Sequence, residues 1–427
     1  MSTSSNPDNS SSNQAPEQFN KGWKPDADKG KEAQGGDDSR PPGKQHVMPE
    51  TPIDDVYADG TPYKAADKLK GKVCLTTGGD SGIGRAFVIL AAMEGAENAI
   101  VYLPQEEEDA KDTQAYVKEK TGKEILLLPY DVKVEENCIK CVEETVAKFG
   151  RLDVLFNNAA QQLQNNDILT LDSQQWRDTF EVNMHSYFYT SKAAIPHLKK
   201  QKGSSIIMNS SINAGIGRPD LLDYTATKGS IISFARGLSN QIVGKTGIRV
   251  NCICPGPILT PLVTSTFSRE NISQTDSTPI GRPGQPIEVA TCVIFLASQD
   301  SSFVTGQLIH CNGGTPQCPN TTAFTQGRPD LLDYTSTKGS IVSFTRGLSN
   351  QIVGKAGVRV NPVAPGPILT PLVTSTFSRE NISQTDGTSI GRPGQSIEVA
   401  TCCIFLASQD ASYVTGQVIH CNGGTPC

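Results

Sequence analysis

The sequence has no uninterrupted apolar run close to the roughly 18 residues that a membrane span needs. Its start also lacks the charged and then apolar segment of a secretory signal. An excess of positive charge is missing as well, because the net charge is -6 and the sequence pI is near 5.5. Binding to a nucleic acid or an anionic membrane needs such an excess on one face. We therefore expect a cytoplasmic protein with a small-molecule substrate and with no nucleic-acid or membrane partner.

Cysteine and histidine do not occur at metal-binding spacings. The one close pair, Cys138 and Cys141, has no second pair and no histidine at zinc spacing. The other cysteines are scattered through apolar segments, and the cytosol would keep all 12 reduced. We expect small buried hydrophobic side chains and no metal site.

Aliphatic residues are almost missing from residues 1–65, which are rich in Ser, Asn, Pro, Asp, Lys and Gly. Such a segment cannot bury enough apolar surface to offset the entropy lost on ordering, so it is predicted to be a disordered polar arm. Beyond it, β-type runs alternate with helical patterns up to about residue 316. This alternation predicts an α/β fold with a doubly wound parallel sheet, the Rossmann fold, over residues 66–316.

The C-terminal part of this region occurs twice. Residues 217–316, here called copy one, align without gaps on residues 327–426, called copy two, with 15 differences in 100 positions. A solenoid needs at least three units, so we interpret residues 327–427 as a partial duplication that follows a linker at 317–326. Copy two has no glycine loop and no counterpart of Ser211, which aligns with Thr321. It is therefore not expected to form an independent active site.

A glycine-rich loop follows the first predicted strand and opens a helix. Its glycines are Gly78, Gly82 and Gly84. In this context backbone N–H groups and the helix dipole can face a pyrophosphate, so the loop predicts nucleotide binding rather than a purely structural turn.

Polar residues follow later predicted strands. Asp131-Val132 and 157–160 come after the third and fourth strands, and Ser210-Ser211 after the fifth. Ligands of open α/β sheets bind at the carboxyl edge, where these residues should meet. The alternative for each is an ordinary polar turn at a strand end.

Tyr224 and Lys228 lie four residues apart in a predicted helix, so their side chains share one face. A nearby ammonium group favours the phenolate and would lower the pKa of the tyrosine from its usual value near 10. The alternative is a surface pair on an amphipathic helix. The same spacing recurs in copy two at Tyr334 and Lys338.

Several motifs together resemble the short-chain dehydrogenase/reductase family over residues 66–316. They are Gly78-x3-Gly82-x-Gly84, Asn157-Asn158-Ala159, Asn183, Ser211, Tyr224-x3-Lys228 and Pro255-Gly256. The loop 77–85, the acidic run 104–110 and the polar segment 42–48 look similar to those of the glucose and ribitol dehydrogenase homologues and of stress-associated oxidoreductases.

The resemblance implies an NAD(P)-dependent oxidoreductase that transfers a hydride between a nicotinamide cofactor and an aldehyde, ketone, sugar or polyol. Tyr224 would exchange a proton with the substrate oxygen, and Ser211 would hydrogen-bond that oxygen. Lys228 would lower the pKa of the tyrosine and hold the nicotinamide ribose. Asn183 would hold a water that links Lys228 to solvent, and Thr260 would contact the carboxamide. The resemblance also implies a homo-oligomer, an assembly that copy two could block.

The implied cofactor site comprises Tyr224, Lys228 and the residues Gly78, Asp80, Ser81, Gly82, Ile83, Gly84, Arg85, Asp131, Val132, Asn158, Ala159, Pro255, Gly256, Ile258 and Thr260. An NAD-specific site would place an acidic residue at the end of the second strand, where this chain has Tyr102. Arg85 could meet a 2′-phosphate, although the acidic run 106–108 would repel it. We favour NADP and keep NAD as the alternative.

Either copy could in principle complete the domain. Copy one has the shorter connection and the native preceding strand, so it should close at higher effective concentration. Copy two would then keep an incompletely buried apolar face. The functional alternative is a nucleotide-binding protein with little catalysis, because copy two obstructs folding, assembly or the cleft.

Overall fold

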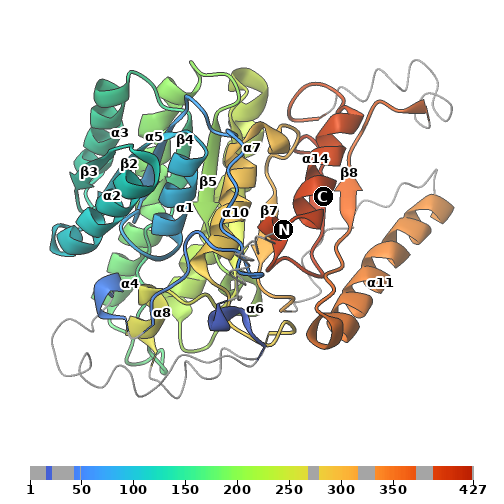
Figure 1. The fold of residues 1–427 in the computed structure, drawn as a ribbon, viewed down its shortest axis with the longest axis horizontal. Coiled ribbons are helices and arrows are strands. Elements are labelled where there is room, and N and C mark those ends of the chain that lie inside the picture. The colour runs from blue at the N-terminus through green and yellow to red at the C-terminus, as the bar shows by residue number, and fades with distance from the viewer. Residues whose placement is uncertain are drawn as a thin grey trace, which may run out of the picture.

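The computed structural model describes residues 16–21, 43–48, 50–267, 278–315, 332–371 and 388–425. A parallel seven-stranded sheet with the order β3-β2-β1-β4-β5-β6-β7 forms its centre (Figure 1). The strands are β1 (Val73–Thr77), β2 (Glu97–Tyr102), β3 (Ile125–Pro129), β4 (Val154–Asn157), β5 (Ser205–Asn209), β6 (Arg249–Pro255) and β7 (Leu308–Cys311). The order reverses between β1 and β4, which opens a crevice at their carboxyl ends. The predicted doubly wound α/β fold is confirmed.

Helices cover both faces of the sheet because its central strands are apolar on both sides; β1, for example, is buried throughout. On one face, α1 (Gly82–Met93) packs against α10 (Pro286–Ala297), with α2 (Glu107–Thr121) beside α1. The other face carries α3 (Glu135–Phe149), α4 (Ser173–Phe180), α5 (Ser186–Leu198) and α7 (Leu222–Thr246). The shorter helices α6 (Asn213–Ile216) and α8 (Pro261–Thr266) flank the crevice. No helix among the described residues is long and apolar enough to cross a membrane.

The ordered part of the chain begins earlier than the composition predicts. Residues 50–65, which were assigned to the disordered arm, lie against the domain. The hydroxyl of buried Tyr63 donates to Glu94 at 2.5 Å, and Asp54 pairs with Arg85 at 3.0 Å. A few aromatic and charged contacts with the finished domain stabilise a segment that has too few aliphatic residues to order by itself.

Copy two repeats local structure but stays outside the main sheet. It forms α11 (Leu332–Ala356), β8 (Val363–Pro365), α14 (Ser396–Ala407) and β9 (Ile419–Cys421). β8 and β9 make a separate two-stranded sheet in the register of β6 and β7, with Val363 opposite Ile419 as Ile253 is opposite Ile309. The strands of copy one complete the seven-stranded sheet, as its short connection predicts. Figure 1 shows copy two beside α10 and β7.

Copy two exposes apolar side chains that copy one buries. Ile404 is 70% exposed and Ile397 is 67% exposed, whereas their counterparts Ile294 and Ile287 are each 1% exposed. The difference arises because the first half of the domain covers copy one only. The predicted incompletely buried face is confirmed for the described part of copy two.

Candidate active site

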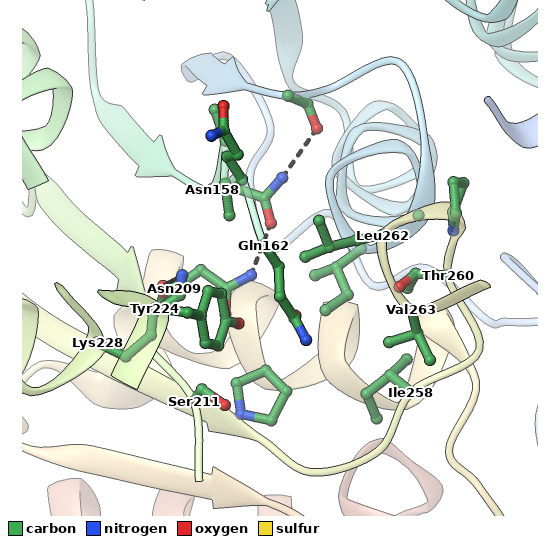
Figure 2. Close-up of a pocket in the computed structure, with 18 of the residues that line it drawn as sticks. Asn158, Gln162, Asn209, Ser211, Tyr224, Lys228, Ile258, Thr260, Leu262 and Val263 are labelled. Atoms are coloured by element: carbon green, nitrogen blue, oxygen red, sulfur yellow. Dashed lines mark hydrogen bonds between the residues drawn. The ribbon is translucent and has the colours of Figure 1, made fainter. Parts of the chain in front are cut away.

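A cavity of about 980 Å³ lies at the carboxyl edge of the sheet, and its described lining residues all fall between Gly78 and Thr315 (Figure 2). Copy two contributes none of them. The predicted site residues that line it are Gly78, Asp80, Ser81, Gly82, Ile83, Asp131, Val132, Asn158, Ala159, Ser211, Tyr224, Lys228, Pro255, Gly256, Ile258 and Thr260. Gly84, Arg85 and Asn183 are not part of the lining.

The glycine loop depends on close backbone approach. Gly78 has φ of +63° and Gly82 of +51°, a region that favours glycine. A Cβ on Gly84 would lie 1.9 Å from the carbonyl oxygen of Gly78. The loop is therefore a cradle that side chains would fill, which fits the pyrophosphate of a dinucleotide at the start of α1.

Two asparagines connect the strand ends around the cavity. The side-chain amide of Asn158 donates to the Gly78 carbonyl at 2.8 Å, and that of Asn209 donates to Asn158 Oδ1 at 2.8 Å (Figure 2). Thr77 Oγ1 accepts from the main-chain N–H of Asn158 at 2.9 Å. The sequence analysis missed Asn209, although its place as the last residue of β5 was a signal. The network fixes the glycine loop relative to the centre of the sheet.

Tyr224, Lys228 and Ser211 meet at one end of the cavity. Lys228 Nζ lies 5.2 Å from the centre of the Tyr224 ring and donates to the Asn209 carbonyl at 2.7 Å. Both helix residues are buried, with Lys228 only 1% exposed. Figure 2 shows Tyr224 and Ser211 beside the same space, into which Gln162 also reaches. Gln162, another lining residue that the sequence analysis missed, has no motif to mark it.

Burial dominates the electrostatics of this group. It lowers the pKa of Lys228 to about 7 and raises the pKa of Tyr224 to about 12, with a hydrogen bond from Ser211 opposing the rise. The expectation that the ammonium group lowers the tyrosine pKa below 10 is therefore wrong in this structure, because the cost of burying each charge sets the direction of both shifts.

Asn183 lies beneath the site in a π-helical turn, Glu181–His185, between α4 and α5. Its Oδ1 accepts from the Gln161 main chain at 2.7 Å, and its Nδ2 donates to the Gln161 carbonyl at 2.9 Å. Nδ2 also donates to Thr227 Oγ1 at 3.1 Å. Both side-chain amide hydrogens are therefore used within the protein, so a water at Asn183 would have to donate to one of its oxygens. π-Turns of this kind are common at functional sites.

Arg85 is turned away from the expected 2′-phosphate site. Its Nε donates to Asp54 at 3.0 Å and one terminal nitrogen donates to Thr113 at 2.6 Å, and the residue is 6% exposed. The proposed phosphate contact of Arg85 does not form in this arrangement. The reason is Asp54, which belongs to the segment that composition assigned to the disordered arm.

Another part of the arm reaches the glycine loop. Gln45 Oε1 accepts from the Gly82 N–H at 2.8 Å, and its own main-chain N–H donates to Asp109 at 2.7 Å. The positive charge of Lys44 acts on Glu106, whose pKa burial nonetheless raises to about 9. The sequence analysis missed these arm contacts because no local pattern connects residues 43–48 with the loop.

Comparisons with known proteins match both the domain and the repeat. A family model described as Enoyl-(Acyl carrier protein) reductase matches residues 78–316 and again 320–426. The chain belongs to the short-chain dehydrogenase/reductase family. It is an enzyme of the oxidoreductase class, and the second match reflects the partial repeat.

Curated relatives of this dehydrogenase/reductase have a length that accommodates the domain with a single copy. General stress protein 39 of Bacillus subtilis is 50% identical over 277 residues, 65% of this chain and 94% of the relative. NADPH-dependent aldehyde reductase 1, chloroplastic, of Arabidopsis thaliana is 48% identical over 279 residues, 64% of this chain and 94% of the relative. Glucose and ribitol dehydrogenase of Daucus carota is 44% identical over 279 residues, which are 64% of this chain and 93% of the relative.

Among solved structures, 3-ketoacyl-(acyl-carrier-protein) reductase from Brucella melitensis complexed with NADH aligns with a TM-score of 0.53 at 29% identity. The match covers 58% of this chain and 98% of that protein. This short-chain dehydrogenase/reductase therefore carries a whole family domain followed by additional chain.

Proposed function

We propose that the protein is an NADP-dependent oxidoreductase that interconverts a small carbonyl compound and its alcohol, with an aldehyde, ketone, sugar or polyol as substrate. The observation that carries this proposal is the convergence of Tyr224, Lys228 and Ser211 in one cavity that the glycine loop also lines. The relatives named for aldehyde reduction and for glucose and ribitol oxidation support this substrate class.

Each side chain has a role that follows from its position. When bound, the nicotinamide supplies or accepts the hydride. Tyr224 Oη gives a proton to the substrate oxygen in reduction and takes it back in oxidation. The Ser211 hydroxyl hydrogen-bonds the same oxygen and stabilises its developing charge. Lys228, held by the Asn209 carbonyl, orients the cofactor ribose, and Thr260 contacts the carboxamide.

The protonated form of Tyr224 is the form that reduction requires. Because burial raises the pKa of Tyr224 to about 12, the residue is a phenol at neutral pH and is ready to donate its proton. Lys228, with a pKa lowered to about 7, can change charge near neutral pH and connect Tyr224 to solvent through a water held by an oxygen of Asn183.

NADP is the cofactor we propose. β2 ends at Tyr102 without a carboxylate that could receive a 2′-hydroxyl. The nearest acid of the lining there, Glu106, is buried, which raises its pKa to about 9 and weakens its repulsion of a phosphate. Lys44 supplies positive charge beside it in place of Arg85. The name of the Arabidopsis relative agrees with this choice.

The proposal is tested with purified full-length protein, a panel of aldehydes, ketones, sugars and polyols, and both cofactors. We expect aldehyde reduction with a higher kcat/KM for NADPH than for NADH. Tyr224→Phe should lower kcat by at least ~1000-fold, since it removes the proton donor. The matched control is Tyr334→Phe, the equivalent substitution in copy two, which has no glycine loop and no counterpart of Ser211 and should leave kcat unchanged. An equal loss from both substitutions would refute the assignment of the site to copy one.

A further inference from the structure

Copy two packs on copy one through contacts that occur in pairs. Four hydrogen bonds between copy one and copy two are each matched by one in which the two copies exchange roles, with partners shifted by 110 residues. The hydrogen bond from Ser302 to Glu398 (2.8 Å) is matched by that from Ser412 to Glu288 (2.9 Å), and the bond from Thr291 to the Asp410 carbonyl (2.6 Å) by that from Thr401 to the Asp300 carbonyl (2.5 Å). The bond from Gln307 to Asn422 (3.0 Å) is matched by that from Gln417 to Asn312 (3.4 Å). In the main chain, the Gly313 N–H donates to the Tyr413 carbonyl (3.0 Å) and the Gly423 N–H donates to the Phe303 carbonyl (2.9 Å).

At the centre of this contact, one residue of copy one meets the equivalent residue of copy two. The rings of Phe295 and Phe405 stack with centroids 4.3 Å apart and an angle of 11° between their planes. These residues occupy the same position in α10 and α14. A residue that meets its own equivalent lies on a two-fold axis, so the axis passes between the two helices.

Aromatic side chains lock the two copies on either side of the axis. The ring of Tyr413 packs on Gly284, and a Cβ added to that glycine would lie 2.8 Å from the ring. The ring of Phe303 packs on Gly394 in the same way, and a Cβ there would lie 2.6 Å from it. A guanidinium group lies 5.4 Å from each ring centre, from Arg282 over Tyr413 and from Arg392 over Phe303. Both rings are fully buried.

This arrangement is that of an isologous interface, in which the same patch contributes to both sides. We propose that copy two takes the place of a second subunit: the face formed by α10, β7 and residues 298–315, here called the pairing face, is one through which a single-copy form of this chain would pair with a second copy of itself. In the full-length chain copy two covers that face, so it cannot join two chains.

The residues of copy one are already suited to pair with themselves. Across the contacts described above, only Phe303 and Tyr413 differ between the copies. Phe303 already seats above Gly394 and Gly423, the counterparts of Gly284 and Gly313, so a second copy one could supply the same pocket. The relatives that match 64–65% of this chain over 93–94% of their own length have no room for a second copy.

The first test removes copy two after Thr315 and counts chains per particle by light scattering coupled to size exclusion. The truncated chain retains the complete sheet and cavity and has the length of the curated relatives, so it should fold alone. We expect twice as many chains per particle as in the full-length protein. Phe295→Arg in the truncated chain should restore the full-length number. The same number of chains in truncated and full-length proteins would overturn the proposal.

The second test keeps the whole chain. Phe405→Arg with Tyr413→Arg places two charges on the side of copy two that meets copy one, which should release the pairing face and double the number of chains per particle. The matched control is Ile397→Arg with Ile404→Arg, which adds the same charge on exposed positions and should change nothing. An unchanged particle in the first variant, or equal changes in both, would contradict the placement of copy two.

Discussion

At the residue scale, the burial of Tyr224 and Lys228 governs the site. Their spacing in the sequence predicts a charged pair, whereas burial favours the neutral form of each side chain. Lys228 is enclosed by Tyr224, Tyr187 and the Asn209 carbonyl, so its neutral form is favoured. A tetrapeptide spacing specifies which side chains share a helix face. It contains no information on how much water remains around them, and this amount determines the direction of the pKa shift.

The shifted lysine predicts a pH-dependent stability. Its pKa is about 7 in the folded chain and 10.5 ordinarily, so between these values the unfolded chain binds more protons and the free energy of unfolding rises with pH. Lys228→Met should abolish this rise. The free energy of unfolding of the wild-type protein should therefore increase relative to that of the variant by up to ~1.4 kcal/mol per pH unit. Denaturant unfolding at pH 7, 8, 9 and 10 measures the difference. Lys192→Met, at a mostly exposed position, is the control and should run parallel to wild type.

At the element scale, the loop between β1 and α1 is the part that sequence predicted best. Three glycines after an apolar strand specify a turn whose backbone must approach itself closely, and the separation of 1.9 Å at Gly84 shows why no side chain is tolerated. The strand-end asparagines were predictable as positions at the carboxyl edge. Their mutual hydrogen bonds were not, because they join residues about 50 and 80 positions apart.

Gly84→Ala should therefore weaken cofactor binding by at least ~10-fold, because the new Cβ displaces the Gly78 carbonyl and opens the cradle. Fluorescence titration with NADPH measures the affinity. Gly237→Ala is the control: it lies exposed within α7 with nothing near its Cβ, so it should keep the affinity and add ~0.5–1 kcal/mol of stability. Comparable affinities for the two variants would argue against the loop as the phosphate site.

At the scale of the whole molecule, the chain holds one complete domain and half of another. The missing half leaves part of copy two open to solvent, and Phe344 is 68% exposed while its counterpart Phe234 packs partly buried against the core. A large exposed apolar face promotes association with other apolar surfaces.

Phe344→Ser should reduce binding of an apolar dye and concentration-dependent light scattering, with little change in Tm. The same substitution at Phe234 should leave dye binding to copy two intact and lower the stability of the domain by about 2 kcal/mol, because it removes packed aromatic surface. If dye binding falls equally in the two variants, the exposed face is not the one assigned here.

The sequence alone predicted the fold class and the glycine loop from the alternation of strand and helix patterns, and it predicted the family and the roles of Tyr224, Lys228 and Ser211 from the resemblance of several motifs taken together. It also established that copy two lacks half of a site. Only the tertiary structure decided that Asp54 pairs with Arg85 outside the cavity lining, that burial reverses the expected tyrosine pKa shift, and that Phe405 stacks on Phe295. These outcomes depend on contacts between distant segments and on the exclusion of water, which no local pattern encodes.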